Sequence, residues 1–217
     1  MTSNPRFALR GLYAITPGMA DTAALVERVA QALDGGAALV QYRAKDAAPA
    51  FALEQARRLV ALCRARGVPL IVNDSVELAL AAGADGVHVG REDAGIAAAR
   101  AALPRGIVGA SCYAMPERAR AAAAAGADYV AIGSVFASAT KPGAVRASLE
   151  HLALARRAGG LPVAAIGGIT AGNVAEVAAA GADMAAVISA LFDAPDVRTT
   201  ARALSRPFTT PAQLAHG

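Results

Sequence analysis

The sequence predicts a single (β/α)8 barrel, an α/β fold in which eight parallel strands close into a ring surrounded by helices. Three observations predict it. A fragment that begins Gly-Ala recurs from Gly36, Gly83, Gly126 and Gly181, each time leading into an apolar run. Four other apolar runs alternate with these. The segments between the runs are rich in Ala, Leu, Arg and Glu, which favour helices. Eight strand–helix steps therefore fit the chain.

The recurring fragment has a direct physical interpretation: a helix ends at the glycine, a tight turn follows, and a buried strand begins. One strand–helix–strand unit is especially clear, because a helical pattern over 75–82, with Ser75 as a candidate cap, joins two apolar runs. Further helices are expected over 51–66 and 117–125. The eight runs, in chain order, are 12–16, 36–40, 70–73, 87–89, 107–111, 126–130, 162–166 and 181–185, and a helix stop and turn over 83–86 precedes the fourth.

The chain has 217 residues, which suits one domain of this kind spanning 1–217, with loose ends at about 1–9 and 205–217. The main alternative is an open, doubly wound sheet. That fold is often marked by a G-x-G-x-x-G turn after its first strand, and no such turn follows Thr16. The barrel is therefore the favoured fold.

Composition excludes several classes of function. The two cysteines, Cys63 and Cys112, make neither a disulfide framework nor a zinc pattern. No signal peptide or 18-residue apolar run is evident, so we expect a cytoplasmic protein without a membrane partner. The net charge of +4 comes from arginines scattered on helix faces, and Trp is absent. A nucleic-acid partner is thus not expected, and the oligomeric state stays open.

Two acidic residues, Asp74 and Asp93, follow the predicted strands over 70–73 and 87–89. Neighbouring parallel strands lie about 4.8 Å apart, so carboxylates at the ends of two such strands can reach one ion. Two carboxylates with water and substrate phosphate are a usual Mg²⁺ site. The alternative is that Asp74 caps a helix and Asp93 is a solvated loop residue.

Lysine is rare in this chain: of 21 basic residues only Lys45 and Lys141 are lysines, and both follow predicted strands in loops. A compact ammonium group at these positions suits phosphate binding, although two lysines could also survive in loops by chance.

The strand ends of a barrel meet on one face, where active sites form. Strands two to four end in cations, amides and acids, which suit a metal-bound diphosphate. Strands six to eight end in hydroxyls and glycines, including Gly167-Gly168 and Ser189, which suit a second phosphate. His88 is expected to line the barrel, and Cys112 is a weak candidate nucleophile. The predicted site therefore binds two anions.

Together these strand ends resemble the thiamine phosphate synthase family. The motifs that carry the resemblance are QYRAK (41–45), ND (73–74), HVGRED (88–93), the serine of GAS (Ser111), SATK (138–141), AIGGI (165–169) and IS (188–189). They occur in order over nearly the whole chain, from about residue 12 to residue 195. Two departures occur. The family often has Thr-Pro-Thr before the lysine, where this chain has Ser-Ala-Thr, and Ser-Thr-His after strand five, where it has Ser-Cys-Tyr.

The resemblance implies an Mg²⁺-dependent transferase that joins a pyrimidine diphosphate to a thiazole phosphate, releasing diphosphate through a carbocation-like path. The implied metal ligands are Asp74 and Asp93, and the implied catalytic residues are Lys141, Arg43, Lys45 and Ser111. The pyrimidine diphosphate would contact Gln41, Tyr42, Arg43, Ala44, Lys45, Asn73, Ser111 and Lys141. The thiazole phosphate would contact Ser138, Ala139, Thr140, Gly168, Ile188 and Ser189.

Three other functions stay open. A thiazole tautomerase would share the thiazole phosphate pocket. It is expected to use a histidine near Tyr113 and to have little need of the Asn73-Asp74 and Glu92-Asp93 pairs. A phosphosugar epimerase or isomerase would need a paired acid and base, which the sequence does not place. A non-catalytic phosphate-binding barrel is expected to have lost Asp74, Asp93 or a lysine.

Overall fold

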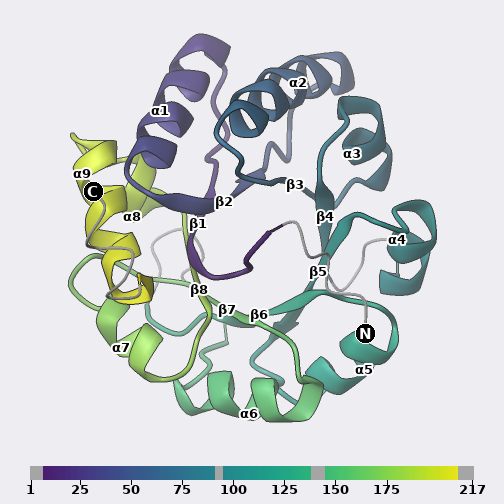
Figure 1. Ribbon diagram of the computed structural model, residues 1–217, viewed down its shortest axis with the longest axis vertical. Coiled ribbons are helices and arrows are strands. Elements are labelled where there is room, and N and C mark those ends of the chain that lie inside the picture. The colour runs from purple at the N-terminus through teal and green to yellow at the C-terminus, as the bar shows by residue number, and fades with distance from the viewer. Residues whose placement is uncertain (1–6, 91–94, 138–144, 210–217) are drawn as a thin grey trace.

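Eight parallel strands form a closed barrel in the computed structural model, in the order β1 to β8 around the ring. Figure 1 looks down this ring and shows the helices outside it. The structure describes residues 7–90, 95–137 and 145–209. The strands are β1 (Gly11–Ile15), β2 (Ala37–Tyr42), β3 (Leu70–Asn73), β4 (Gly86–Val89), β5 (Ile107–Tyr113), β6 (Tyr129–Gly133), β7 (Val163–Ile166) and β8 (Met184–Val187). The fold predicted from the sequence is confirmed.

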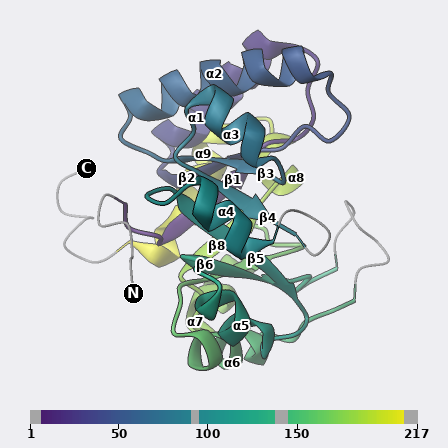
Figure 2. The same cartoon turned by 90° about the vertical axis from the view of Figure 1, so that its right-hand side faces the viewer.

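The helices follow the strands and cover the barrel on all sides, with α1 to α3 opposite α5 to α7 in the side view of Figure 2. Two elements after β8, α9 and η1, were not predicted from the sequence. The helical elements are α1 (Thr22–Asp34), α2 (Pro49–Ala65), α3 (Val76–Ala82), α4 (Ile96–Ala102), α5 (Arg118–Ala124), α6 (Glu150–Gly159), α7 (Val174–Ala179), α8 (Ser189–Phe192), α9 (Val197–Ser205) and η1 (Arg206–Phe208). None of these helices is both long and apolar enough to cross a membrane.

Alternation along the strands divides the core into two layers. In β1, Leu12 and Ala14 pack outward against the helices, whereas Tyr13 and Ile15 point into the barrel. The interior layer is completed at the amino ends of the strands by partly buried Phe7 and Leu9. The first described residues therefore pack against the barrel interior, although the sequence suggested a loose end there.

The carboxyl-terminal end is likewise packed as far as it is described. The hydroxyl of Ser205 donates to the carbonyl of Gly36 (3.0 Å), just before β2. Phe208 in η1 is only 4% exposed, and its carbonyl accepts a hydrogen bond from Arg10. The expectation of a loose end from residue 205 is wrong for 205–208, because these residues cover the ends of β1 and β2.

The aspartates of the recurring fragment act at the amino ends of the strands. Asp128, before β6, donates its N–H to the carbonyl of Val108 in β5 (2.7 Å), and its carboxylate accepts the N–H of Val108 (2.8 Å). Asp85 clamps Leu70, and Asp183 clamps Val163, in the same two-point way. Each clamp joins an odd-numbered strand to the next even-numbered strand. The motif that predicted the fold thus has a structural role of its own.

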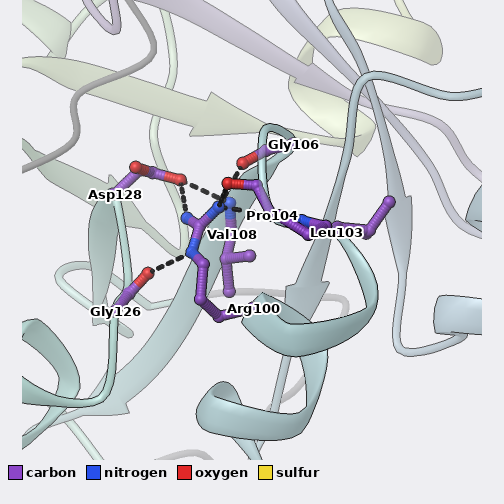
Figure 3. Close-up of polar contacts among 7 residues, drawn as sticks. All are labelled: Arg100, Leu103, Pro104, Gly106, Val108, Gly126 and Asp128. Carbon is purple, nitrogen blue, oxygen red and sulfur yellow. Dashed lines mark hydrogen bonds and ion pairs between the residues drawn. The ribbon is translucent and has the colours of Figure 1, made fainter.

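An arginine reinforces the clamp at Asp128 (Figure 3). Arg100, near the end of α4, forms an ion pair with Asp128 and also donates to the backbone carbonyls of Gly126 (3.0 Å) and Gly106 (2.7 Å). Charge-assisted hydrogen bonds between largely buried groups are strong. This cluster therefore holds together α4, the turn before β5 and the turn before β6. Arg156, which is more exposed than Arg100, likewise forms an ion pair with Asp183.

Candidate active site

A cavity of about 550 Å³ opens at the carboxyl ends of the strands, and all eight strands contribute to its lining. Apolar side chains of β1, β6, β7 and β8 form much of its wall, and polar groups stand at several strand ends. A largely apolar cleft with a few placed polar groups is the usual form of a small-molecule site. The predicted site residues that line it are Gln41, Arg43, Asn73, Ser111, Gly168, Ile188 and Ser189.

On one side of this cavity, β2 and β3 present an amide, a guanidinium and a second amide. Gln41 is 3% exposed, so its side chain lies deep in the barrel. The backbone N–H of Arg43 donates to the hydroxyl of Thr16 at the end of β1 (2.9 Å). This bond holds the end of β2, from which the Arg43 side chain reaches the cavity.

The other three residues of the 41–45 motif lie elsewhere. The hydroxyl of Tyr42 donates to Gln55 of α2 (2.9 Å), which places this ring in the outer layer, and burial raises its pKa to about 12. Ala44 packs against the outer core, and Lys45 is exposed. Since alternate residues of a strand face opposite sides, the side chain of Tyr42 cannot line the cavity together with that of Gln41.

Asp74 has a positive φ of 66°, which is uncommon for a residue other than glycine but is tolerated by aspartate. Its N–H donates to the carbonyl of His88 in β4 (2.9 Å), and the side-chain amide of Asn73 donates to its carboxylate. The helix cap is Ser75, whose hydroxyl accepts the N–H of Leu78 (3.0 Å). Asp74 is therefore not the N-cap of α3, and its partly exposed carboxylate stands at the end of β3.

A carboxylate oxygen in this position is the type of ligand that Mg²⁺ prefers. The second predicted ligand, Asp93, lies outside the described residues, as do Ser138, Ala139, Thr140 and Lys141.

A chain of hydrogen-bonded side chains crosses the barrel beneath the cavity. Its two phenols, Tyr13 and Tyr129, meet at 2.7 Å with their rings edge to face. Burial raises the pKa of both phenols well above the ordinary value, so both stay protonated. His88 is 7% exposed and lines the cavity, as expected from the sequence. The links are Gln41 Nε2 to Tyr13 Oη (2.7 Å), Tyr129 Oη to His88 Nδ1 (2.9 Å), and His88 Nε2 to Ser111 Oγ (2.9 Å).

The opposite side of the cavity depends on glycine. Gly168 has φ +64°, and a Cβ at this position would lie 2.2 Å from the carbonyl oxygen of Ala137. Only glycine fits this close approach of the loops that follow β6 and β7. The side chain of Asn173 closes the loop after β7, because it donates to the carbonyl of Gly168 (3.0 Å) and accepts the N–H of Thr170 (2.8 Å).

The end of β8 leads directly into α8, which begins at Ser189. The first N–H groups of a helix have no acceptor within the helix, so they can bind an anion. Arg28 of α1 donates to the carbonyl of Phe192 (2.6 Å) and so anchors the other end of α8. Ile188 and Ser189 both line the cavity beside Gly168.

Sequence reasoning missed several lining residues. Tyr13 could have been found from the alternation of β1, whereas Thr170, Asp193 and Tyr113 lie on loops or at a strand end and carry no local signal. Cys112 is 1% exposed in the outer layer, and burial raises the pKa of its thiol to about 11. It points away from Ser111 and does not line the cavity, so it is not placed as a nucleophile.

This fold and site define a class: a (β/α)8 barrel with a cavity at the carboxyl ends of its strands, a glycine loop after β7 and a short helix after β8, an arrangement that suits phosphorylated ligands. The sequence profile described as thiamine monophosphate synthase matches residues 12–191, and the chain belongs to this family.

Relatives at high identity agree. The thiamine-phosphate synthase of Aromatoleum aromaticum is 59% identical over 193 residues, which are 88% of this chain and 93% of that protein. That of Thiobacillus denitrificans is 57% identical over 199 residues, 91% of this chain and 94% of the other. The structure described as a thiamine phosphate pyrophosphorylase from Pyrococcus furiosus superposes with a TM-score of 0.83 at 38% identity, covering 96% of this chain and 98% of that one.

Proposed function

We propose that this protein is a thiamine phosphate synthase, which condenses 4-amino-2-methyl-5-(diphosphooxymethyl)pyrimidine with thiazole phosphate to give thiamine phosphate and diphosphate. Family membership supports the activity. The observation that carries it is that one cavity brings the amide and cationic ends of β2 and β3 opposite the glycine loop of β7 and the start of α8. Such a cavity can hold two phosphorylated ligands with their rings together.

The pyrimidine diphosphate would lie on the side of β2, β3 and β5. There, the guanidinium of Arg43 suits bidentate contact with the diphosphate, and the amides of Gln41 and Asn73 and the hydroxyl of Ser111 suit the polar edge of a pyrimidine. Lys45 and Lys141 would complete the diphosphate site. The outward position of the Tyr42 side chain leaves its backbone, with that of Ala44, as the part that could contact substrate.

The thiazole phosphate would lie on the side of β7 and β8. Gly168 allows a phosphate close to the backbone. The backbone N–H groups of Ile188 and Ser189, at the start of α8, would donate hydrogen bonds to this phosphate. Ser138, Ala139 and Thr140, which precede Lys141 in the chain, would add hydroxyl and backbone contacts.

Mg²⁺ fits the chemistry of Asp74, and we propose that Asp74 and Asp93 hold it. When bound, it would neutralise charge on the leaving diphosphate. The turn at Asn73-Asp74 presents the carboxylate of Asp74 at the end of β3. A diphosphate held by Arg43 could there contact an ion that Asp74 binds. We further expect the protein to work in the cytoplasm, where its two cysteines stay reduced.

In the proposed reaction, the bond between the pyrimidine methylene carbon and the diphosphate oxygen breaks, and its electron pair leaves with diphosphate. The electron-rich pyrimidine stabilises the resulting cation, and the lone pair of the thiazole nitrogen forms the new carbon–nitrogen bond. The protein need not form a covalent intermediate. Apolar residues such as Ile15, Ala131 and Ile166 would keep water from capturing the cation, while Arg43 and the lysines stabilise the departing charge.

The test is an assay of diphosphate release from the pyrimidine diphosphate with Mg²⁺, run with and without the thiazole phosphate and with EDTA. We expect release to need both substrates and the metal, and thiamine phosphate to form in equal amount. If folded protein releases no diphosphate, the proposal is wrong.

A further inference from the structure

The side-chain chain beneath the cavity runs between two of the proposed substrate contacts. Gln41 of β2 is at one end and Ser111 of β5 is at the other. Tyr13, Tyr129 and His88 connect them across the barrel interior, and all three are at least nine-tenths buried. Among the described residues, no buried side-chain polar atom lacks a hydrogen-bond partner. The buried polar atoms of this chain are therefore all hydrogen-bonded.

The direction of its hydrogen bonds follows from the groups themselves. An amide nitrogen can only donate, so Tyr13 Oη accepts from Gln41 Nε2. The single hydroxyl hydrogen of Tyr13 then goes to Tyr129 Oη, since the amide nitrogen offers no lone pair. Tyr129 Oη, having accepted that bond, donates its own hydrogen to His88 Nδ1. Nδ1 is therefore the acceptor nitrogen of the imidazole.

The protonation of His88 determines the direction of the Ser111 hydroxyl in the cavity. With Nδ1 unprotonated, the ring proton of His88 lies on Nε2 and is donated to Ser111 Oγ (2.9 Å). The hydroxyl hydrogen of Ser111 then points away from His88, and Ser111 lines the cavity. A ligand in the cavity would meet Ser111 as a hydrogen-bond donor.

We propose that Tyr13, Tyr129 and His88 are positioning residues that set the Nε2–H tautomer of His88 and thereby fix Ser111 as a donor toward the substrate. Nothing in the chain requires a covalent step or a change of charge. This inference deepens the proposed synthase function and rests on it for its effect on turnover, whereas the tautomer of His88 can be measured without turnover.

The first experiment is a long-range ¹H–¹⁵N correlation spectrum of the full protein labelled with ¹⁵N-histidine. His88→Gln assigns the His88 signals against those of His151 and His216. We expect a protonated Nε2 and an unprotonated Nδ1 in the wild type, and a change in this pattern in Tyr129→Phe. A protonated Nδ1 in the wild type would overturn the proposal, whatever the protein catalyses.

The second experiment is a double-mutant cycle on diphosphate release with Tyr129→Phe and Ser111→Ala. We expect kcat to fall about a hundred-fold in Ser111→Ala and about ten-fold in Tyr129→Phe, because the latter only misorients the donor. In the Ser111→Ala background, Tyr129→Phe should have no further effect on kcat. Equal losses in both backgrounds would show that Tyr129 does not act through Ser111.

Two controls separate positioning from stability. Ser205→Ala removes another buried, hydrogen-bonded hydroxyl, at the amino ends of the strands, and should leave kcat unchanged. Tyr13→Phe breaks the same chain one step earlier and should have the same effect on kcat as Tyr129→Phe. It serves as the test if Tyr129→Phe folds poorly. Wild-type protein that turns over nothing would instead refute the proposed function and leave the tautomer result standing.

Discussion

The two ends of this barrel are built on different principles. At the amino ends, one device recurs, with Asp85, Asp128 and Asp183 each clamping a residue of the preceding strand. At the carboxyl ends, the strands present a mixture of amides, an imidazole, hydroxyls and apolar side chains to the cavity. The comparison teaches that a repeated motif marks the stabilising end of a barrel, while the residues that occur once mark its chemistry. Substitutions at the two ends should therefore separate activity from stability.

The largest effect is expected from removing a cation of the cavity. Arg43→Ala should lower kcat/KM about 10²- to 10³-fold, because charge developing on the leaving diphosphate loses a direct partner. Lys141→Ala should likewise cripple turnover while the protein stays folded. Kinetics together with thermal unfolding check this. Arg58→Ala, which removes an exposed arginine of α2, is the control. Near-normal turnover in Arg43→Ala would contradict the proposed role of the 41–45 motif.

The next largest effect concerns the glycine loop. Gly168→Ala places a Cβ 2.2 Å from the Ala137 carbonyl oxygen, so the loop must shift. We expect KM for the thiazole phosphate to rise about ten-fold, or about 1.4 kcal/mol. Gly67→Ala is a matched control, since the φ of Gly67 (+65°) is nearly the same as that of Gly168 (+64°), but no atom lies within 4 Å of the added Cβ. Should both variants raise KM equally, backbone strain and not the close approach would be the cause.

Substitutions at the amino ends of the strands should lower the stability of the protein without changing its activity. Asp128→Ala removes the side-chain half of the Val108 clamp and leaves Arg100 without its carboxylate, so we expect about 2–4 kcal/mol lower free energy of unfolding. Turnover per folded molecule should stay unchanged. Asp34→Ala is the control, because this half-exposed aspartate pairs with Arg66 and Arg198 and clamps no strand; it should cost under about 1 kcal/mol. Equal losses in the two variants, measured by urea unfolding, would refute the clamp.

The smallest effect tests the boundary between the inner and outer layers. Cys112 neighbours Ser111 but faces the helices, and burial raises its thiol pKa to about 11. At pH 8 the native thiol should resist iodoacetamide, and Cys112→Ala should keep its turnover. The folded state retains this proton above pH 9 while the unfolded state loses it. The protonated Cys112 thiol therefore contributes to the stability of the folded state below pH 9, and this contribution is lost as pH rises from 9 to 11. Rapid inactivation at pH 8 would place the thiol in the cavity.

Sequence patterns predicted the eight strands well, because the Gly-Ala-Asp fragment and the apolar runs are local signals. β3, for example, matches its predicted bounds of 70–73. They did not predict α9 or the packing of Phe208, since an amphipathic end segment gains its structure from contact with α1 and β1. Residues at strand ends, such as Gln41 and Asn73, were predicted as cavity residues because parallel strands end on one face.

The hydrogen-bonded chain from Gln41 to Ser111 could not be predicted from the sequence. Its members come from five strands, and their contacts depend on which strands face each other across a closed ring. The roles of Asp93 and of 138–141 stay predictions, because these residues lie outside those that the structure describes.

The aspartate clamps also bear on how the chain assembles. Each one lies inside a strand–helix–strand module: β3 with β4, β5 with β6, and β7 with β8. In the first module, Ala38 stands where the other three fragments have aspartate, and the β1–β2 register shifts between Leu12 and Tyr13. Each of these three modules thus has a clamp of its own before the ring closes. The strands β1 and β2 instead pack against α9, whose Ser205 donates to the carbonyl of Gly36 just before β2. We expect the barrel to be completed at that seam, where α9 arrives after every strand has been synthesised.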